Sequence, residues 1–308
     1  MNRTKIEWVK NLDGSPGYTW NPVWGCKNHC QYCYARIIAR RFGKQVAEKE
    51  IKYREANGIA KSENPILHNF IVHLRNWADC DVILYPCNVE RVQRFEPTVL
   101  FSHIFSRLPS SKKPSAIFIN SMSDPAYWDD NTVQMVLIRV QSPEMLEHKF
   151  ILLTKSVDFL LKYGSQLGSI ENLWVGLTVG NHTGKHNPLA ILPYFTDRFI
   201  VNHEPILSYY SLPDPCDMQQ PVSWIILGAQ TDPMPQFVER CYYDELLRQA
   251  RERKIPVFIK DSLDISVPGI IDFSENRAIP YWVRDKYGKA IIAELKAMQL
   301  MNKMRRNK

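Results

Sequence analysis

Short apolar or β-prone segments recur along the chain and alternate with longer segments of mixed apolar and charged residues. The apolar segments span residues 18–22, 81–86, 116–120, 149–154, 173–179, 198–202, 223–228 and 256–260. Segments of helical composition lie between many of them, at residues 34–56, 90–108, 131–146 and 242–254. Strands that are apolar at nearly every position, alternating with helices, are typical of a parallel sheet covered on both faces. We therefore predict an α/β fold, a partial or complete (β/α) barrel of parallel strands, with an open doubly wound sheet as the alternative.

The length of the chain bounds its domain organisation. With 308 residues, 45% of them hydrophobic, it can bury a large core, and α/β barrels of this size commonly form one domain. We predict a single domain over residues 1–308, with an N-terminal arm at 1–17, a helical segment at 34–80 and a C-terminal extension at 264–308. Residues 34–56 favour one helix, or two helices broken near Gly43. Ile291, Leu295, Met298 and Met301 recur at helical spacing in the extension, which predicts a helix packed on the barrel.

Composition narrows the cellular setting and the partners. No apolar run approaches the roughly 18 residues that a membrane span needs, and the N-terminus leads into no apolar signal segment. The seven cysteines are odd in number and three are clustered, which favours a reducing compartment over a disulfide framework. We therefore predict a cytoplasmic protein without membrane contact. The net charge of +7 permits a nucleic-acid partner without requiring one, because basic tails such as residues 303–308 are usually solvated.

Three cysteines on one loop are the strongest chemical signal. Cys26, Cys30 and Cys33 have the spacing C-x3-C-x2-C and directly precede the helical segment that starts at Tyr34. Thiolates gathered this densely usually hold a metal ion or an iron-sulfur cluster. A structural zinc, completed by His29, Cys80, Cys87 or a remote histidine, is the alternative. Without such a fourth protein ligand, three thiolates leave one coordination position of the metal or cluster open for chemistry.

Polar residues follow the predicted strands, and in a parallel barrel those ends meet at one mouth. They are Ser121, Ser123, Asp124, Lys155, Thr178, Asn181, Glu204, Gln230 and Lys260. Each has a purely structural alternative. Asp124 and the serines can cap a helix that begins at Pro125, residues near Gly180 can form a plain turn, and the lysines can pair with Glu204 or Asp124.

The cysteine spacing, with Tyr32 before the last cysteine, resembles the signature of radical S-adenosylmethionine enzymes. From about Lys5 to Leu263 the chain is also similar to a phage and bacterial three-cysteine-motif family that is related to these enzymes. The similarity lies in the order of six motifs: Trp-Asn-Pro-x-x-Gly-Cys, Asn-Ser-Met-Ser-Asp, Leu-Thr-Lys, Glu-Pro-Ile-Leu, Trp-Ile-Ile-Leu-Gly and Val-Phe-Ile-Lys. The resemblance implies that the three cysteines bind a [4Fe-4S] cluster and that S-adenosyl-L-methionine is cleaved to a 5′-deoxyadenosyl radical. It also implies that Tyr32 and the strand-end residues bind the cofactor.

The predicted function is therefore a radical S-adenosylmethionine enzyme whose substrate is a nucleobase or nucleic acid, the substrate class resting on analogy. A flavodoxin- or ferredoxin-like protein would supply its electrons. Cys87, at the end of a predicted strand, is a candidate hydrogen-atom donor. Two alternatives stay open: a non-catalytic nucleic-acid-binding protein stabilised by zinc or a cluster, and a barrel that uses its cluster for electron transfer only.

Overall fold

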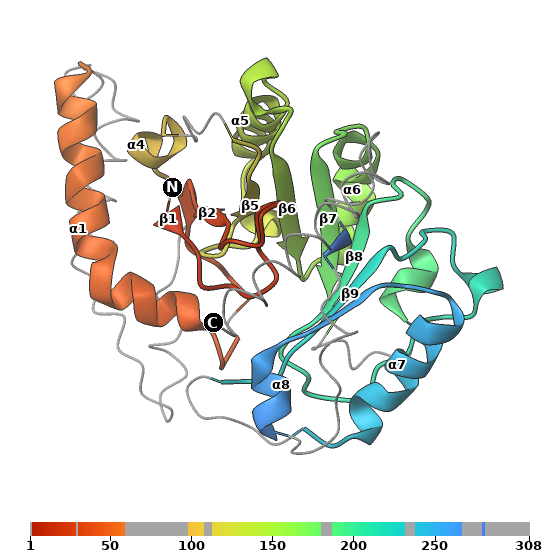
Figure 1. Ribbon diagram of the computed structural model, residues 1–308. Coiled ribbons are helices and arrows are strands. Elements are labelled where there is room, and N and C mark those ends of the chain that lie inside the picture. Colours follow the sequence, from red (N-terminus) through yellow and green to blue (C-terminus); the bar gives the residue numbers. More distant parts are fainter. Residues whose placement is uncertain are drawn as a thin grey trace, which may run out of the picture. The chain divides into compact units, whose positions relative to one another are not determined.

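The computed structural model describes residues 2–28, 30–58, 98–107, 113–179, 187–231, 238–266 and 279–280 (Figure 1). The strands are β1 Asn2–Arg3, β2 Tyr18–Trp20, β3 Val23–Trp24, β4 Val99–Leu100, β5 Ala116–Ile119, β6 Lys149–Thr154, β7 Leu173–Thr178, β8 Phe199–His203, β9 Trp224–Leu227 and β10 Val257–Ile259. The α-helices are α1 Tyr34–Ala56, α4 Ser102–Phe105, α5 Asp130–Val140, α6 Val157–Gly168, α7 Cys241–Glu252 and α8 Asp261–Ser266. Short 3-10 helices are η2 Pro125–Tyr127, η3 Pro143–Met145, η4 Pro188–Ile191 and η5 Pro215–Asp217.

Eight strands form one sheet in the order β1-β2-β5-β6-β7-β8-β9-β10, while β3 pairs with β4 in an antiparallel ribbon. Neighbouring strands from β6 to β10 are all parallel, with Val175 opposite Phe199 and Ile200 opposite Trp224. The prediction of an α/β fold with a mostly parallel sheet is confirmed. In the described part of the chain no pairing joins β1 to β10, so the sheet has two free ends there.

Every predicted strand but one overlaps an observed strand, and the exception, 81–86, lies outside the described residues. Residues 34–56 form the single helix α1, without a break at Gly43. The predicted helix 131–146 is shorter than expected, because α5 ends at Val140 and Pro143 then begins a 3-10 turn. The predicted helix at 242–254 is confirmed as α7.

The helix predicted at residues 90–108 is wrong at residues 98–101. Val99 and Leu100 form β4, and only the short helix α4 follows. Val99 and Phe101 are 1% and 0% exposed, and Leu100 between them is half-buried, which is the period of two that belongs to a strand. Pairing with β3 therefore overrides the helical composition of this segment.

The described residues divide into two compact units. The first comprises Met1–Asn2, Thr19–Ser110 and Ile119–Met135, and the second comprises Arg3–Tyr18, Ser111–Phe118 and Val136–Lys308. Each unit has an apolar cluster of its own.

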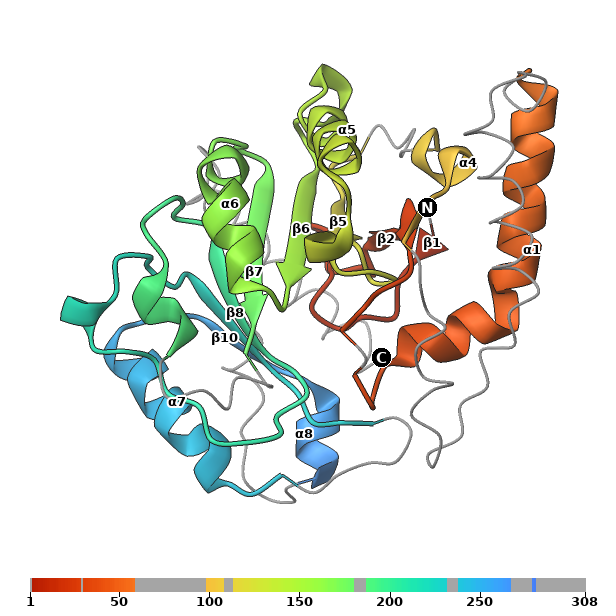
Figure 2. The same ribbon diagram turned by 180° about the vertical axis from the view of Figure 1, so that it is seen from behind.

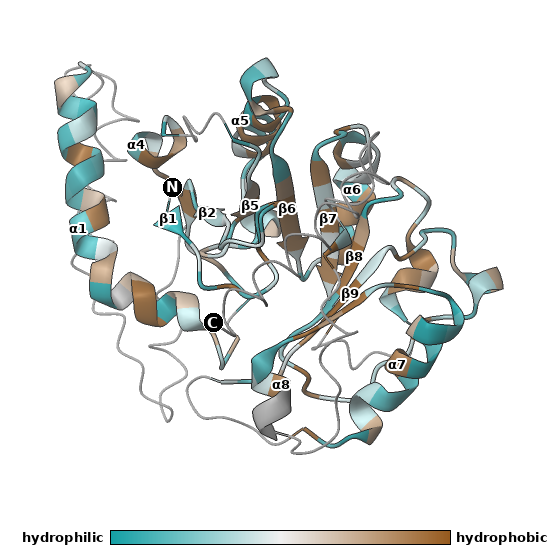
Figure 3. Ribbon diagram, viewed as in Figure 1, coloured by the Kyte–Doolittle hydropathy of each residue, from teal (hydrophilic) through white to brown (hydrophobic). Residues whose placement is uncertain are grey.

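The second unit is built on the parallel strands, which are hydrophobic along most of their length (Figure 3). Every second residue along these strands points to the same face of the sheet, where the side chains form a buried cluster with residues of the N-terminal segment. The cluster comprises Trp8, Val9, Ala116, Phe118, Ile151, Leu153, Trp174, Ile200, Trp224, Ile226 and Phe258. Trp8 packs edge-on against Phe118 and Trp224, with ring centroids 5.0 and 6.0 Å apart. Helix α6 lies over β7 (Figure 2). The sheet is thus apolar up to the point where its strands end.

The first unit contains the cysteine loop. Its apolar cluster is formed by Trp24, Ala35, Ala39, Ala47, Val99, Phe101 and Met122. Cys26 and Cys33 pack against this cluster. The β3–β4 ribbon and the first half of α1 therefore provide an apolar wall for two of the three thiols.

Candidate functional site

The cysteine loop runs from β3 to α1 and lies beside the segment that follows β5. Gly25 forms a parallel bridge with Ser123, and its backbone N–H donates to the Met122 carbonyl at 3.2 Å. Gly25 has a φ of 102°, a region that residues with a side chain rarely occupy. The glycine before Cys26 therefore lets the chain turn out of β3 while staying bonded to residues 120–124.

The three thiols lie close enough to act on one another electrostatically. Burial raises the pKa of Cys26 to about 12, helped by the nearby charges of Asp124 and the other two cysteines. Burial also raises the pKa of Cys33, against the opposing effect of the Arg36 backbone N–H and guanidinium. The raised pKa values favour the protonated form of both thiols, and binding a metal would release their protons.

Arg36 near the start of the cysteine-loop helix is a feature that sequence reasoning missed. Arg36 is only 2% exposed, and its guanidinium favours the thiolate form of Cys33. Cys33 is also the N-cap residue of α1, where free N–H groups favour negative charge. An arginine in a helix start is usually a solvated residue, so only its burial reveals this arrangement.

Asp124 is joined to the cysteine loop by hydrogen bonds. Its Oδ2 accepts from the Asn28 side chain at 2.8 Å, and its Oδ1 accepts from the Ala126 N–H at 3.1 Å as the N-cap of η2. Tyr127 Oη donates to Asn28 Oδ1 at 2.8 Å. The structural role predicted as the alternative for Asp124 is thus confirmed, and the same carboxylate lies near the Cys26 thiol.

Ser121 and Ser123 have structural hydrogen bonds of the same kind. Ser121 exchanges two hydrogen bonds with Asn21, both of 2.8 Å, and its carbonyl accepts from Tyr34 Oη at 2.9 Å. Ser123 Oγ accepts from the Trp128 indole N–H at 2.7 Å. Half-buried Tyr32 lies on the turn before Cys33. Hydrogen bonds thus join Ser121, Ser123 and Asp124, which follow β5, to residues of the cysteine loop and the start of α1, whereas Tyr32 belongs to that loop itself.

Among the described residues, no group of three or more His, Cys, Asp or Glu side chains converges as closely as a bound metal ion requires. The donor set nevertheless suits an anionic thiolate centre, since three thiols share one loop with helix N–H groups and a buried guanidinium. His29 and Cys87 lie outside the described residues.

In the second unit, the ends of β8, β9 and β10 hold a charged pair. Lys260 Nζ donates to Glu204 Oε1, and both side chains pass over Gly228, where a Cβ atom would lie 2.9 Å from Lys260 Cδ and 3.1 Å from Glu204 Cγ. Burial alone would lower the pKa of Lys260, but the charges of Glu204 and Glu7 outweigh it and raise that pKa. The pairing predicted as the alternative for Lys260 is confirmed.

Thr178 and Asn202 lie next to this pair on the same sheet face. Asn202 Nδ2 donates to Thr178 Oγ1 at 3.1 Å, and its buried Oδ1 accepts no hydrogen bond from the residues that the structure describes. Asn202 is recognisable in the sequence as a polar residue at the end of an apolar strand, although it is not among the site residues predicted above. Half-buried Lys155 follows β6 and half-buried Gln230 follows β9, as predicted, whereas Asn181 lies outside the described residues.

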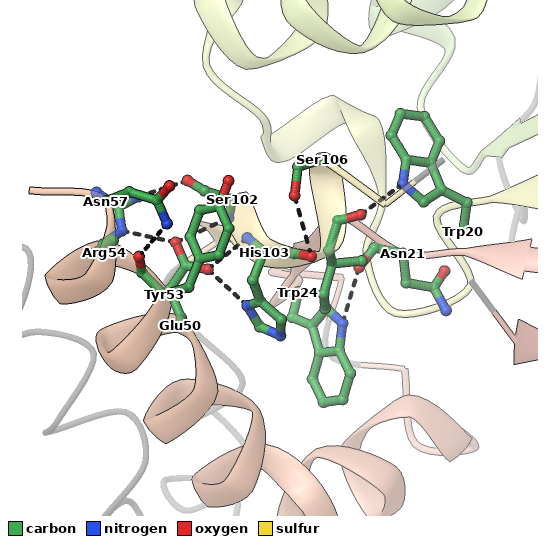
Figure 4. A network of polar contacts seen from close by, with 11 residues as sticks. Trp20, Asn21, Trp24, Glu50, Tyr53, Arg54, Asn57, Ser102, His103 and Ser106 are labelled. Atoms are coloured by element: carbon green, nitrogen blue, oxygen red, sulfur yellow. Dashed lines mark hydrogen bonds and ion pairs between the residues drawn. The ribbon is translucent and has the colours of Figure 1, made fainter. Parts of the chain in front are cut away.

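A buried carboxylate joins α1 to α4 in the first unit (Figure 4). Glu50 is fully buried, and it accepts hydrogen bonds from the backbone N–H groups of Ser102 and His103, both at 2.9 Å. His103 Nδ1 lies 2.7 Å from Oε2, and Arg54 Nε donates to Oε1 at 2.7 Å. These bonds lower the pKa of Glu50 to about 2, although burial would raise it. The arrangement joins the second half of α1 to α4.

The fold and site define an α/β protein whose parallel strands end in polar residues and whose three-thiol loop precedes its longest described helix. The chain belongs to the family described as protein of unknown function (DUF5131), which matches residues 3–267. Among curated proteins and among solved structures, none matches the chain significantly. Within the described ranges, no helix has the length and apolar character needed to cross a membrane.

Proposed function

We propose that the chain is an iron-sulfur enzyme, a radical S-adenosylmethionine enzyme with a barrel of that type, located in the cytoplasm. The observation that carries the proposal is the clustering of Cys26, Cys30 and Cys33 on one loop at the start of α1, with Arg36 buried beside them. Three thiolates, a helix N-terminus and a buried cation together favour an anionic cluster with one open corner.

The three cysteines would hold three irons of a [4Fe-4S] cluster. When bound, the cluster supplies the electron that cleaves the sulfonium of S-adenosylmethionine. The chain contributes an apolar wall, formed by residues such as Trp24 and Met122, against which two of the thiols pack. Asp124 offers a carboxylate beside the thiols, and a cationic amino group needs such an acceptor.

The remaining predicted cofactor contacts are part of the same proposal: Tyr32, Ser121, Ser123, Lys155, Thr178, Asn181, Glu204, Gln230 and Lys260. A nucleobase or nucleic acid is the proposed substrate, supported by the net charge of +7. The proposed electron donor is a flavodoxin- or ferredoxin-like protein.

The test uses anaerobically purified and reconstituted full-length protein. We expect about four irons per chain and an electron paramagnetic resonance spectrum of the reduced sample that changes on adding S-adenosylmethionine. Serine at Cys26, Cys30 or Cys33 should abolish the iron signal, whereas serine at the exposed free thiol Cys216 should leave it unchanged. One bound zinc without iron would contradict the proposal and support a zinc-stabilised binding protein. A cluster spectrum indifferent to S-adenosylmethionine would support electron transfer instead.

A further inference from the structure

Asn28 contacts two of the three thiols through its main chain. Its backbone N–H donates to Cys26 Sγ at 3.5 Å, and its carbonyl accepts from Cys30 Sγ at 3.9 Å. The peptide groups on both sides of Asn28 therefore lie between Cys26 and Cys30. A rotation of these peptide groups would alter the contacts of both thiols.

The side chain of Asn28 is attached at two points to a single short turn. Its Nδ2 donates to Asp124 and its Oδ1 accepts from Tyr127, both at 2.8 Å. Because an ionised carboxylate only accepts hydrogen bonds, the contact with Asp124 requires the amide nitrogen on that side. Asp124 is the N-cap of η2 and Tyr127 is its last residue, so both partners belong to one hydrogen-bonded turn. Two bonds to one turn prevent the amide from rotating.

We propose that Asn28 is a positioning residue for the thiol site: its two side-chain hydrogen bonds hold the peptide groups that set the directions of Cys26 and Cys30. The inference rests on the proposed function in assigning these thiols to an iron-sulfur cluster. Asn28 itself binds no metal. It acts as the outer partners of metal ligands do, by orienting ligands before the metal arrives.

The experiment compares two ways of replacing Asn28 in the full chain. Asn28→Ala removes both side-chain bonds. The double variant Asn28→Asp with Asp124→Asn re-forms them in reverse, because the introduced carboxylate would accept from both the introduced amide and Tyr127, and the total charge is unchanged. Asn57→Ala is the matched control, since Asn57 also donates a side-chain hydrogen bond, to the Tyr53 carbonyl at 2.7 Å at the other end of α1.

The readouts are the Co²⁺ affinity of the metal-free protein, its thiolate-to-cobalt absorption spectrum, and the iron content after reconstitution. We expect Asn28→Ala to weaken Co²⁺ binding by about tenfold and to shift the spectrum. The double variant should regain both the wild-type affinity and spectrum, and Asn57→Ala should resemble the wild type. Melting temperatures confirm that each variant is folded.

Two results would overturn the inference: an Asn28→Ala variant with wild-type affinity and spectrum, or a double variant no better than Asn28→Ala. Failure of the proposed function has a different signature. In that case the wild type assembles no iron cluster, while its Co²⁺ binding still depends on Asn28 as described.

Discussion

At the scale of single residues, Glu50 shows how a buried charge can be stabilised without a metal or ligand. Four hydrogen bonds to its carboxylate outweigh the cost of burial, and its pKa falls from 4.5 to about 2. A carboxyl group with a lowered pKa stabilises the fold at all pH values above its unfolded pKa. That stabilisation is lost as the pH falls from about 4.5 to about 2.

We predict that Glu50→Gln lowers the free energy of unfolding at neutral pH by about 2 to 3 kcal/mol, because the amide cannot accept all four bonds. Urea unfolding at a series of pH values measures this effect. The wild type should lose stability between about pH 4.5 and pH 2, and the variant should lose less over that interval. Glu144→Gln, in an exposed pair with Arg139, is the control and should behave as wild type. An equally steep pH dependence in Glu50→Gln would contradict the account.

At the scale of elements, α6 packs closely against the segment that precedes β8, and the closest contacts are made at two glycines of the helix. A Cβ atom on Gly168 would lie 1.8 Å from the Phe195 carbonyl oxygen, and one on Gly164 would lie 3.0 Å from the Phe195 ring. Backbone cannot move aside as a flexible side chain can. The distance between α6 and this segment is therefore determined at Gly168.

Gly168→Ala should destabilise the protein by about 1 to 3 kcal/mol, despite the higher helix propensity of alanine. Thermal or urea unfolding measures the change. Ser165→Ala, at an exposed position of the same helix, is the control and should be neutral or slightly stabilising. If Gly168→Ala proves as stable as Ser165→Ala, the close approach does not limit the packing of α6.

At the scale of the whole molecule, the hydrophobic core of the second unit is built without any residue of the cysteine loop. Its buried cluster contains Trp8, Trp174 and Trp224 but no residue of the cysteine loop. Removing the proposed metal ligands should therefore leave that core intact, unlike in small zinc domains that unfold without their metal.

The corresponding prediction concerns a triple variant with serine at Cys26, Cys30 and Cys33. It should bind no iron, yet the backbone amides of β6 to β9 should keep wild-type protection from hydrogen exchange, measured by mass spectrometry or NMR. A variant with serine at the exposed thiols Cys216 and Cys241 is the control for loss of cysteine as such. Loss of protection across β6 to β9 would mean that the second unit depends on the thiol site.

How much could be predicted depends on the range of the interactions involved. The strands β6 to β10 were predictable because each is a contiguous apolar run, and burial on both faces leaves that pattern in the sequence. The segment of β4 was mispredicted because its partner β3 lies far away along the chain. Asp124 and Lys260 were named correctly as strand-end residues, and Glu204 was named as a possible partner of Lys260. Asn28, the partner of Asp124, was not named.

The sequence by itself determined the α/β class, the positions of strands β6 to β10 and the three-thiol spacing, because each is a local pattern of residue types. Only the tertiary structure decided which polar side chains meet. Glu50 and His103 are 53 positions apart, and Asn28 and Asp124 are 96 apart. Neither pair has a local signature, since a buried hydrogen bond depends on where the backbone brings two groups together. The thiol spacing thus specified a candidate metal site, and the packing of α1 and η2 decided which residues support it.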